Sequence, residues 1–364
     1  MKLTDIPVEG YEKIVRCDDP ALGLKAFIAV HDTTLGPALG GIRMWPYLSE
    51  HEAFSDVKRL ARGMTYKSAL AATELGGGKA VVIGDPSIGK STALLRAMGR
   101  FVHALDGLYI AAEDVGTTED DMAIIRQETP YVTGLSRAHG SSGNPAWFTA
   151  FGVFLGIRLC LERVLRTDCL TGIRVAIQGC GNVASHLCQL LHDAEAELIV
   201  ADVVAEKTYR LSERYGARVV APDMIHRVPC EVYAPCALGG TLNDITIPQL
   251  ACVIVAGSAN NQCLRPESSD LLRESVILYA PDFVINAGGI INIAAELEPT
   301  GYDEARAVAH VHRITSVLHE IFDLAAHQKI ATERAAILLA ERKLAAARGA
   351  KKRSRRCAHN PFSS

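Results

Sequence analysis

Short runs of apolar residues recur through the second half of the chain, separated by stretches of helical or loop character. They occupy residues 174–178, 197–202, 231–234, 253–256 and 276–279. Short apolar runs bounded by loops are typical of buried strands. An apolar helical pattern from about Pro145 to just before Asp168 leads into the first run. The alternation predicts an α/β fold with a doubly wound, mostly parallel sheet.

The first part of the chain mixes strand and helix periods. Strands are predicted over 24–30, 80–83 and 107–112, and helices over 91–105 and from about Thr118. Ser49 and Glu52 form a capping-box pattern that predicts the start of another helix. The spacing of that helix's apolar positions brings Lys67 onto its inward stripe. Those positions are Ala53, Val57, Leu60 and Met64.

Two lysines, Lys67 and Lys79, are the candidate chemical groups of this region. A lysine on a buried stripe costs about several kcal/mol unless it is paired or bound to a ligand. Lys79 follows the triple glycine 76–78, a backbone that a small substrate can approach closely. The strand over 107–112 ends in Glu113 and Asp114, and a carboxylate there is a natural acid–base partner. The alternative is a surface lysine after a flexible turn, and a helix that frays before Lys67.

Composition is that of an ordinary soluble protein of two domains. The 364 residues are 49% hydrophobic and 22% charged, with a formal net charge of -3. This charge gives no general attraction to nucleic acid or anionic membranes, and no run is long enough for a spanning helix. The start carries no signal-peptide core. Ten cysteines without CxxC pairs suggest neither a zinc site nor a disulfide scaffold, so we expect a reducing cytoplasm and no metal.

A segment rich in Gly, Ser and Pro at 136–145 predicts the domain boundary. We expect a substrate and oligomerisation domain over 1–140, completed by C-terminal helices at about 325–350. A nucleotide-binding domain is expected over 141–324. The basic tail, 351–364, is expected to be a frayed terminus rather than a nucleic-acid arm. Hinges for closure of the cleft between the domains are expected near 136–150 and 285–305.

A dinucleotide fingerprint of the form G-x-G-x-x-A occupies residues 179–184, after a predicted strand and at the start of a predicted helix. Gly179 allows the tight turn, Gly181 the approach of a pyrophosphate, and Ala184 close packing of the helix on the strand. Asp202, at the end of the next strand, would bind the ribose 2′-hydroxyl and repel a 2′-phosphate. The pattern therefore predicts NAD rather than NADP as cofactor. The alternative is a structural glycine turn in an unrelated sheet.

Several long motifs resemble the amino-acid dehydrogenases that act on glutamate, leucine, phenylalanine and valine, and most closely their leucine dehydrogenase branch. The resemblance covers about residues 10–345. Its motifs are the segments around Lys67 and Lys79 and residues 36–44, 112–117, 141–145, 234–239, 259–262 and 281–289. It implies reversible, NAD-dependent oxidative deamination of an L-amino acid to a 2-oxo acid and ammonia. It also implies a homo-oligomer, often an octamer in the leucine branch.

The resemblance also implies roles for particular residues. Lys67 would hold the substrate carboxylate, beside the backbone at Gly40, Gly41 and Gly77, with Met64 nearby. Lys79 would be catalytic, polarising the developing carbonyl and activating the attacking water. Asp114 would carry protons to and from the amine. Asn261 would lie near cofactor and substrate, and Thr149 near the nicotinamide amide, although both could be structural polar groups. Further cofactor contacts are expected at Cys180, Asn182, Val183, Cys236, Ala237 and Asn260.

The pKa values of the two main groups depend on their neighbours. Near a second lysine in a dry cleft, the pKa of Lys79 should be lowered, which suits acid–base work. Burial of Asp114 away from cations would raise its pKa, so its distance from Lys79 matters.

The side-chain pocket is expected at Leu39, Ala112, Ile290 and Ile293. Related glutamate enzymes typically carry a lysine where Leu39 stands, and without it a charged substrate would lose its counter-ion. The two isoleucines replace valines usual in the leucine branch, so a smaller pocket would favour valine and shorter chains. One methylene is worth only about 1–3 kcal/mol, so the preference should be graded.

The predicted substrates are therefore leucine, valine and isoleucine, with phenylalanine as the main competitor. Two different functions compete with this prediction: a catalytically silent NAD-binding sensor and a 2-hydroxy-acid enzyme. The sensor would be favoured by loss of a lysine or the aspartate, and the 2-hydroxy-acid enzyme by a suitably placed histidine; neither condition is met.

Overall fold

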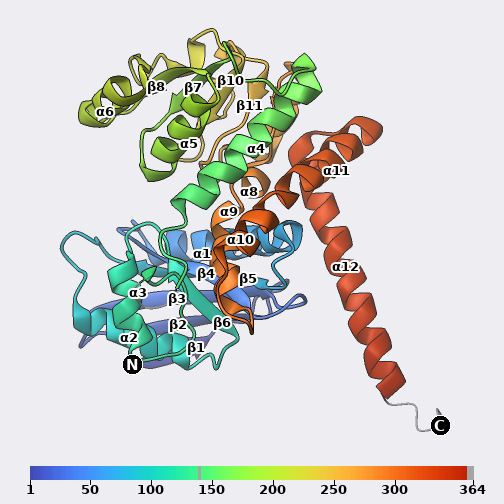
Figure 1. The fold of residues 1–364 in the computed structure, drawn as a ribbon. Helices are drawn as coiled ribbons and strands as arrows, with labels where there is room; N and C mark the ends of the chain where they lie inside the picture. Colours follow the sequence, from blue (N-terminus) through green and yellow to red (C-terminus); the bar gives the residue numbers. More distant parts are fainter. Residues whose placement is uncertain (138–140, 359–364) are drawn as a thin grey trace. The chain divides into compact units, whose positions relative to one another are not determined.

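The computed structural model describes residues 1–137 and 141–358, with side chains to Lys351. The chain divides into two compact units. Unit 1 consists of Met1–Asn144, Ile293–Tyr302 and the chain from Ala340, and unit 2 of Pro145–Asn292 and Asp303–Leu339. Each unit contains a six-stranded sheet, and both sheets can be followed by colour in Figure 1.

The sheet of unit 1 has the order β1-β2-β3-β5-β4-β6. The first three strands and β5 pair antiparallel, while β4 runs parallel to both β5 and β6. The carboxyl ends of β4, β5 and β6 therefore lie at one edge of the sheet. The strands are β1 (Lys2–Asp5), β2 (Lys13–Asp19), β3 (Leu24–Asp32), β4 (Ala38–Trp45), β5 (Gly76–Ile83) and β6 (Tyr109–Glu113).

Helices cover the two faces of this sheet. Helix α1 (Glu50–Ala71) packs on one face, where Val57 and Ala61 share a core with Phe27 and Val81. Helices α2 (Thr92–His103) and α3 (Glu119–Arg126) supply the core on the opposite face. Because side chains alternate along a strand, odd-numbered residues of β4 and β5 face α1 and even-numbered residues face α2 and α3.

Helix α1 begins where the sequence predicts, with a different cap. The Ser49 hydroxyl accepts from the Glu52 amide at 3.1 Å, but the Glu52 carboxylate accepts from Leu48, one residue before the predicted partner. The buried stripe also differs: Ala61, Thr65 and Ser68 continue it, whereas Leu60, Met64 and Lys67 lie half-buried on its flank. These small residues allow α1 to lie close to the glycines of β5. The longer side chains of Leu60, Met64 and Lys67 therefore lie beside this contact and not within it.

The sheet of unit 2 is entirely parallel, with the order β12-β11-β10-β7-β8-β9. Strand order reverses between β7 and β10, as in doubly wound dinucleotide-binding folds, so the predicted fold class is confirmed. Strand β9 lacked an apolar run and was not predicted. The strands are β7 (Arg174–Gln178), β8 (Glu197–Ala201), β9 (Arg218–Val219), β10 (Val232–Pro235), β11 (Ile254–Val255) and β12 (Leu278–Tyr279).

Helices connect and follow these strands. Helix α4 (Ala146–Leu165) precedes the first strand, and the connecting helices are α5 (Asn182–Asp193), α6 (Ala205–Tyr215), η2 (Ile225–Arg227), η3 (Ile247–Gln249) and α7 (Pro266–Glu274). The later helices are α8 (Asp282–Ile285), α9 (Gly288–Ala294), η4 (Ala295–Leu297), α10 (Glu304–Val311), α11 (Arg313–Gln328) and α12 (Thr332–Ala358).

The division of the chain differs from the predicted bounds in the C-terminal third. Residues 293–302 belong to unit 1, where the Glu296 carboxylate accepts from the amides of Gly134 at 3.1 Å and Ser142 at 2.9 Å. Residues 325–339 belong to unit 2, where the Thr332 hydroxyl donates to the Tyr279 carbonyl at 2.7 Å. Helix α12 thus begins in unit 2 and continues in unit 1.

Helix α12 also extends through residues 351–358, where a frayed tail was predicted; the last six residues lie outside the described part.

Candidate active site

The candidate catalytic residues lie on the parallel strands β4, β5 and β6, on the face of the sheet that packs against α1; Lys79 is in the middle of β5, and Asp114 directly follows β6. Register pairs Leu39 with both Gly77 and Ile110, and Gly41 with Ala112. Alternation then assigns one set of predicted site residues to this face. The set is Leu39, Gly41, Gly77, Lys79, Ala112 and, directly after β6, Asp114.

Lys79 and Asp114 form a largely buried ion pair. The Lys79 Nζ lies 2.9 Å from Asp114 Oδ1, and the two side chains expose 6% and 17% of their surface. The turn after β6 is fixed by Thr117, whose hydroxyl accepts from the Asp114 amide at 2.9 Å and donates to the Ile42 carbonyl at 2.8 Å. The structure therefore brings together the two residues for which sequence analysis predicts acid–base roles.

A third charged residue, Arg43, completes this cluster and was not predicted. Its Nε donates to Asp114 Oδ2 at 2.8 Å and its Nη1 to Asp56 Oδ2 at 3.1 Å. The Tyr47 hydroxyl also donates to Asp56 Oδ2, at 2.7 Å. The available signal was the alternation of β4, which places Arg43 two residues after Gly41 on the same face.

These neighbours set the pKa values of the pair. Burial lowers the pKa of Lys79; the Asp114 carboxylate opposes this effect and the Arg43 charge reinforces it. Burial acts to raise the pKa of Asp114, but the Lys79 and Arg43 charges outweigh it, and the pKa is lowered. Sequence analysis predicted that a nearby second lysine would lower the pKa of Lys79. The positive charge that lowers it is instead that of Arg43.

The predicted glycines are explained first by packing. A Cβ at Gly77 would overlap the backbone nitrogen of Thr65 in α1, and a Cβ at Gly40 would overlap the Gly78 carbonyl. A Cβ at Gly41 would lie 2.7 Å from Cβ of Asp114. The absence of a side chain at Gly77 was predicted to make room for the substrate, but in the structure it makes room for helix α1.

The remaining predicted substrate residues occupy several elements. Lys67 lies half-buried on α1, two residues after Thr65, and Leu39 and Ala112 are buried in the sheet. Ile290 and Ile293 are three positions apart on α9, so both lie on one side of that helix, and both are buried.

Thr149 and Asn261, which were predicted to lie near the cofactor or to be structural polar groups, both lie in unit 2. The Thr149 hydroxyl donates to the Pro145 carbonyl at 3.2 Å, within the first turn of α4. Asn261 is exposed and has a left-handed backbone with φ of 53°.

The glycine loop of unit 2 has the geometry of a dinucleotide site. Gly179 adopts φ of +93°, which favours glycine, and a Cβ there would lie 2.7 Å from that of Ala237. At Gly181, the cap of α5, a Cβ would meet nothing within 4 Å, so the helix N-terminus is open to a ligand. Ala184 is buried, whereas Asn182 is exposed and Val183 half-buried.

Asp202 has a second role in this loop that was not predicted. Its Oδ2 accepts from the Cys180 amide at 2.7 Å, and its Oδ1 accepts from the Val204 amide at 2.8 Å. The carboxylate therefore anchors the glycine loop while its half-buried side chain remains accessible.

The neighbouring strand ends supply the other predicted cofactor residues. The Cys236 amide donates to the Gln178 carbonyl at 2.7 Å, and Ala237 is exposed. The Asn260 side chain accepts from that of Asn286 at 2.8 Å. Asn286 and Gln262 lie in motifs of the sequence but were assigned no role there; Gln262 is fully buried, and its backbone N–H donates to Asp282 Oδ2 at 2.7 Å.

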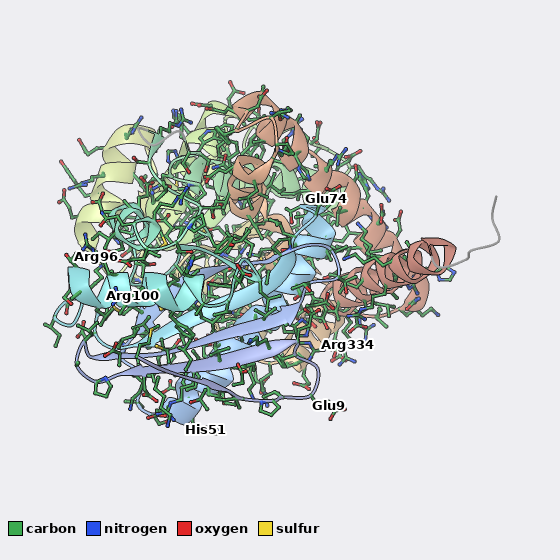
Figure 2. The ribbon with its side chains drawn as sticks, turned by 90° about the horizontal axis from the view of Figure 1, so that it is seen from below. Glu9, His51, Glu74, Arg96, Arg100 and Arg334 are labelled. Atoms are coloured by element: carbon green, nitrogen blue, oxygen red, sulfur yellow. The ribbon has the colours of Figure 1, made fainter. Side chains whose placement is uncertain are left out.

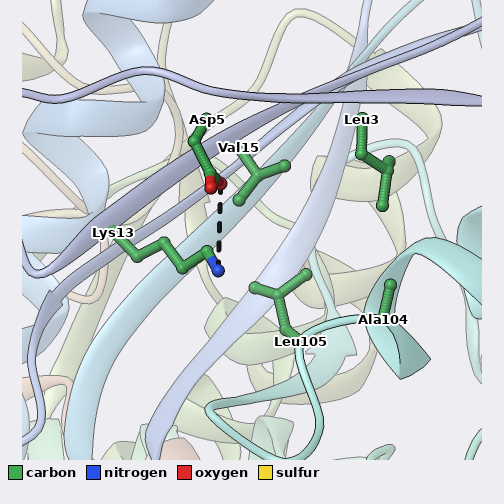
Figure 3. Close-up of a pocket in the computed structure, with 6 residues that line it drawn as sticks. All are labelled: Leu3, Asp5, Lys13, Val15, Ala104 and Leu105. Atoms are coloured by element: carbon green, nitrogen blue, oxygen red, sulfur yellow. Dashed lines mark ion pairs between the residues drawn. The ribbon is translucent and has the colours of Figure 1, made fainter.

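A small depression lies elsewhere in unit 1, between β1, β2 and the residues after α2 (Figure 3). Its one ion pair joins Lys13 Nζ to Asp5 Oδ1 at 3.8 Å, and both side chains are exposed. The depression has none of the buried charge of the Lys79 cluster.

The described part of the chain, residues 1–137 and 141–358, contains no helix that combines the length and apolar character needed to cross a membrane. Within the same ranges, no group of three or more His, Cys, Asp or Glu side chains is arranged to hold a metal ion.

A parallel sheet with an open glycine loop in one unit, and a buried Lys–Asp pair in the other, define a nucleotide-dependent dehydrogenase of two α/β units. Two family models match the chain. The dimerisation domain of Glu/Leu/Phe/Val dehydrogenases matches residues 11–131, and the Glutamate/Leucine/Phenylalanine/Valine dehydrogenase model matches residues 200–351. The chain belongs to this family of amino-acid dehydrogenases, as the sequence motifs predict.

Individual relatives cover nearly the whole chain. Leucine dehydrogenase of Geobacillus stearothermophilus is 52% identical over 94% of this chain and 92% of its own length. Phenylalanine dehydrogenase of Thermoactinomyces intermedius is 44% identical over 90% of this chain and 89% of its own. The crystal structure of L-tryptophan dehydrogenase from Nostoc punctiforme has a TM-score of 0.80 and 44% identity, covering 93% of this chain and 97% of its own.

Proposed function

We propose that this chain catalyses the reversible, NAD-dependent oxidative deamination of the branched-chain amino acids L-leucine, L-valine and L-isoleucine. The products are the 2-oxo acids and ammonia. The observation that carries the proposal is the buried Lys79–Asp114 pair, on the same sheet face as the apolar Leu39 and Ala112. The 52% identity to a leucine dehydrogenase supports the substrate class.

The surroundings of the pair suit an amino acid with an uncharged side chain. Lys67, half-buried on α1, would hold the substrate carboxylate. Leu39 is almost completely buried and offers no counter-ion, so a second carboxylate in the substrate would remain unpaired. Ile290 and Ile293 would complete the apolar wall.

The acid–base steps follow from the lowered pKa of Lys79. Its neutral amine accepts a proton from the water that attacks the substrate imine, and its ammonium form polarises the carbonyl oxygen as it develops. Asp114 exchanges protons with the substrate nitrogen. Because Nζ and Oδ1 are 2.9 Å apart, a proton can pass between them, and the pair titrates as one coupled unit.

The residues of unit 2 fit NAD. The open position at Gly181 and the N-terminus of α5 would accept the pyrophosphate, and Asp202 would accept the ribose 2′-hydroxyl. When bound, NAD supplies the hydride acceptor for the substrate α-carbon. A carboxylate at Asp202 also disfavours the additional phosphate of NADP.

The test is a panel that follows NADH formation at alkaline pH with L-leucine, L-valine, L-isoleucine, L-phenylalanine, L-tryptophan and L-glutamate. Activity on the three branched-chain substrates, lost in Lys79→Ala, is the expected result. Lys25→Ala is a matched control, because Lys25 Nζ pairs with Glu50 Oε1 at 2.6 Å in the same unit, and both side chains are exposed at the surface. That variant should keep its activity per folded molecule.

Phenylalanine is the second candidate substrate, supported by the 44% identity to a phenylalanine dehydrogenase. The residues expected to line the substrate side chain, Leu39, Ala112, Ile290 and Ile293, are all apolar, so modest differences in their volume would separate the two substrates. Turnover of phenylalanine equal to or better than that of leucine would overturn the branched-chain assignment. Binding of NAD without turnover of any substrate would indicate a silent sensor.

We further propose a cytoplasmic homo-oligomer assembled through unit 1. The matched model over residues 11–131 is described as a dimerisation domain, and the nine cysteines whose side chains the structure describes are free thiols, as expected in a reducing compartment. Light scattering of the purified protein would measure the number of subunits, for which the leucine branch suggests eight.

A further inference from the structure

Arg43 links two carboxylates that come from different elements. Its Nε contacts Asp114 Oδ2 at 2.8 Å, and its Nη1 contacts Asp56 Oδ2 on α1 at 3.1 Å. The side chains of Arg43 and Asp56 expose 18% and 14% of their surface, so both contacts are largely shielded from water. The rigid, planar fork of a guanidinium can hold two carboxylates at a fixed separation, which the point charge of a lysine cannot do.

The contact with Arg43 leaves the two Asp114 oxygens with separate partners. Oδ2 accepts from Arg43, and Oδ1 accepts from Lys79. Rotation of the Asp114 carboxyl group would break both contacts. Asp56 is itself held by the Tyr47 hydroxyl and by Arg59, so the chain of contacts ends on α1 and at the surface.

We propose that Arg43, anchored by Asp56, is a positioning residue that fixes the Asp114 carboxylate with one oxygen toward Lys79 and keeps a permanent positive charge beside that lysine. The inference rests on the proposed acid–base roles of Lys79 and Asp114.

The fixed charge has a consequence for the state of Lys79. The charged groups that act on Lys79 are Asp114 from the end of β6, Arg43 from β4 and Asp56 from α1. The two carboxylates favour the ammonium form, and Arg43 opposes it. Removal of the Arg43 charge should therefore raise the pKa of Lys79. Replacement of the guanidinium by another positively charged group should leave that pKa unchanged.

The experiment compares Arg43→Gln and Arg43→Lys in the full-length enzyme with leucine and NAD. In wild type, log(kcat/KM) should rise with pH as Lys79 becomes neutral. In R43Q the rising limb should move to higher pH by about one unit, the size that a neighbouring charge produces. In R43K the limb should stay in place, while kcat falls because the lysine cannot bridge both carboxylates.

Arg100→Gln is the matched control for loss of an arginine. Arg100 lies on α2, labelled in Figure 2, and its Nη1 is 3.5 Å from Glu128 Oε2. It makes no contact with the cluster that the structure describes. Both the limb and kcat should remain at wild-type values in R100Q.

A second readout does not depend on turnover. Trace acetylation with acetic anhydride at a series of pH values, followed by mass spectrometry of the Lys79 peptide, measures the pKa of this lysine in each variant. The expected result is a higher value in R43Q and an unchanged one in R43K. Asp56→Asn, which keeps Arg43 and Asp114 but weakens the anchor, should lower kcat even if R43Q does not fold.

The outcomes separate the two proposals. A wild-type enzyme that oxidises none of the amino acids would overturn the proposed function, and the acetylation series would still measure the effect of Arg43 on Lys79. If the rising limb of the kcat/KM pH profile and the pKa of Lys79 are both unchanged in R43Q, the inference is overturned. Wild-type kcat in both R43K and D56N would also overturn it.

Discussion

Two partly buried carboxyl groups, Asp114 in unit 1 and Glu333 in unit 2, have pKa values shifted in opposite directions. Burial acts to raise both. At Asp114, the Lys79 and Arg43 charges reverse this effect, and the pKa is lowered. At Glu333, in the first turn of α12, burial and the nearby Asp282 carboxylate raise the pKa to about 7.

The comparison shows that the neighbours decide the charge state of a buried acid. Asp114 sits between two cations and is held as a carboxylate. Glu333 lies among Asp282, Asp270, Ser269 and Cys263, and near neutral pH it is held partly as the uncharged acid. The first arrangement keeps charged groups ready for proton exchange. The second lets α12 begin against β12 and α7 with less buried charge.

The largest effect is expected for Asp114→Asn. This change leaves Lys79 and Arg43 without their shared carboxylate, and breaking a buried pair costs about 3 kcal/mol. Loss of a positioned acid–base group should lower kcat/KM by about 10² to 10⁴-fold. Urea unfolding and steady-state kinetics measure the two effects.

Asp5→Asn is a suitable control for D114N, because Asp5 lies on the exposed edge strand β1 and its contact with Lys13 is 3.8 Å long. It should change the free energy of unfolding by no more than about 0.5 kcal/mol. A D114N variant with the kinetics of wild type would contradict the assigned role of Asp114.

An intermediate effect of opposite sign is expected for Glu333→Gln. The pKa of Glu333 is about 7 in the folded protein against an ordinary 4.5, so the unfolded chain releases its proton first as pH rises. Stability is therefore lost between about pH 4.5 and 7 and stays at the lower level above that range. The glutamine cannot ionise, so E333Q should be more stable than wild type at pH 8, by up to about 3 kcal/mol.

The measurement for E333Q is urea unfolding at pH 5 and at pH 8, since the gain should be several-fold smaller at the lower pH. Glu320→Gln, on the exposed side of α11, provides the control, and its stability should match that of wild type at both pH values. A destabilised E333Q at pH 8 would mean that the carboxylate is stabilised by its surroundings, as at Asp114.

Many of the strands and helices could be predicted because local patterns determine them, but β1, β2 and β4 of unit 1 were not predicted. The alternating and apolar runs correspond to β3, β7, β8 and β10 within about two residues, and Ser49 caps α1 as its sequence indicates. The doubly wound order followed from strands alternating with helices. The short β9 has no such pattern and depends on pairing with β8.

The site could be predicted only where a motif fixes it. Lys79 was predicted from the triple glycine before it and Asp114 from its position at a strand end, both within family motifs, but the partnership of Arg43 with Asp56 depends on the contact between α1 and β4. The flank position of Lys67 depends on Thr65 packing against Gly77. Such choices between neighbouring helix faces are decided by tertiary packing, which the spacing of apolar residues alone does not contain.

The smallest effect is expected for Arg59→Gln, which tests how far the charged cluster extends. Arg59 pairs with Asp56 from the solvent side and exposes 54% of its side chain, so water screens this contact. Asp56 keeps Arg43 and Tyr47 as partners, and the free energy of unfolding should change by less than about 0.5 kcal/mol. The rising limb of kcat/KM should also stay in place, since the fixed charge beside Lys79 is retained. A shift comparable to that in R43Q would mean that the surface arginine, rather than Arg43 alone, sets the charge state of Lys79.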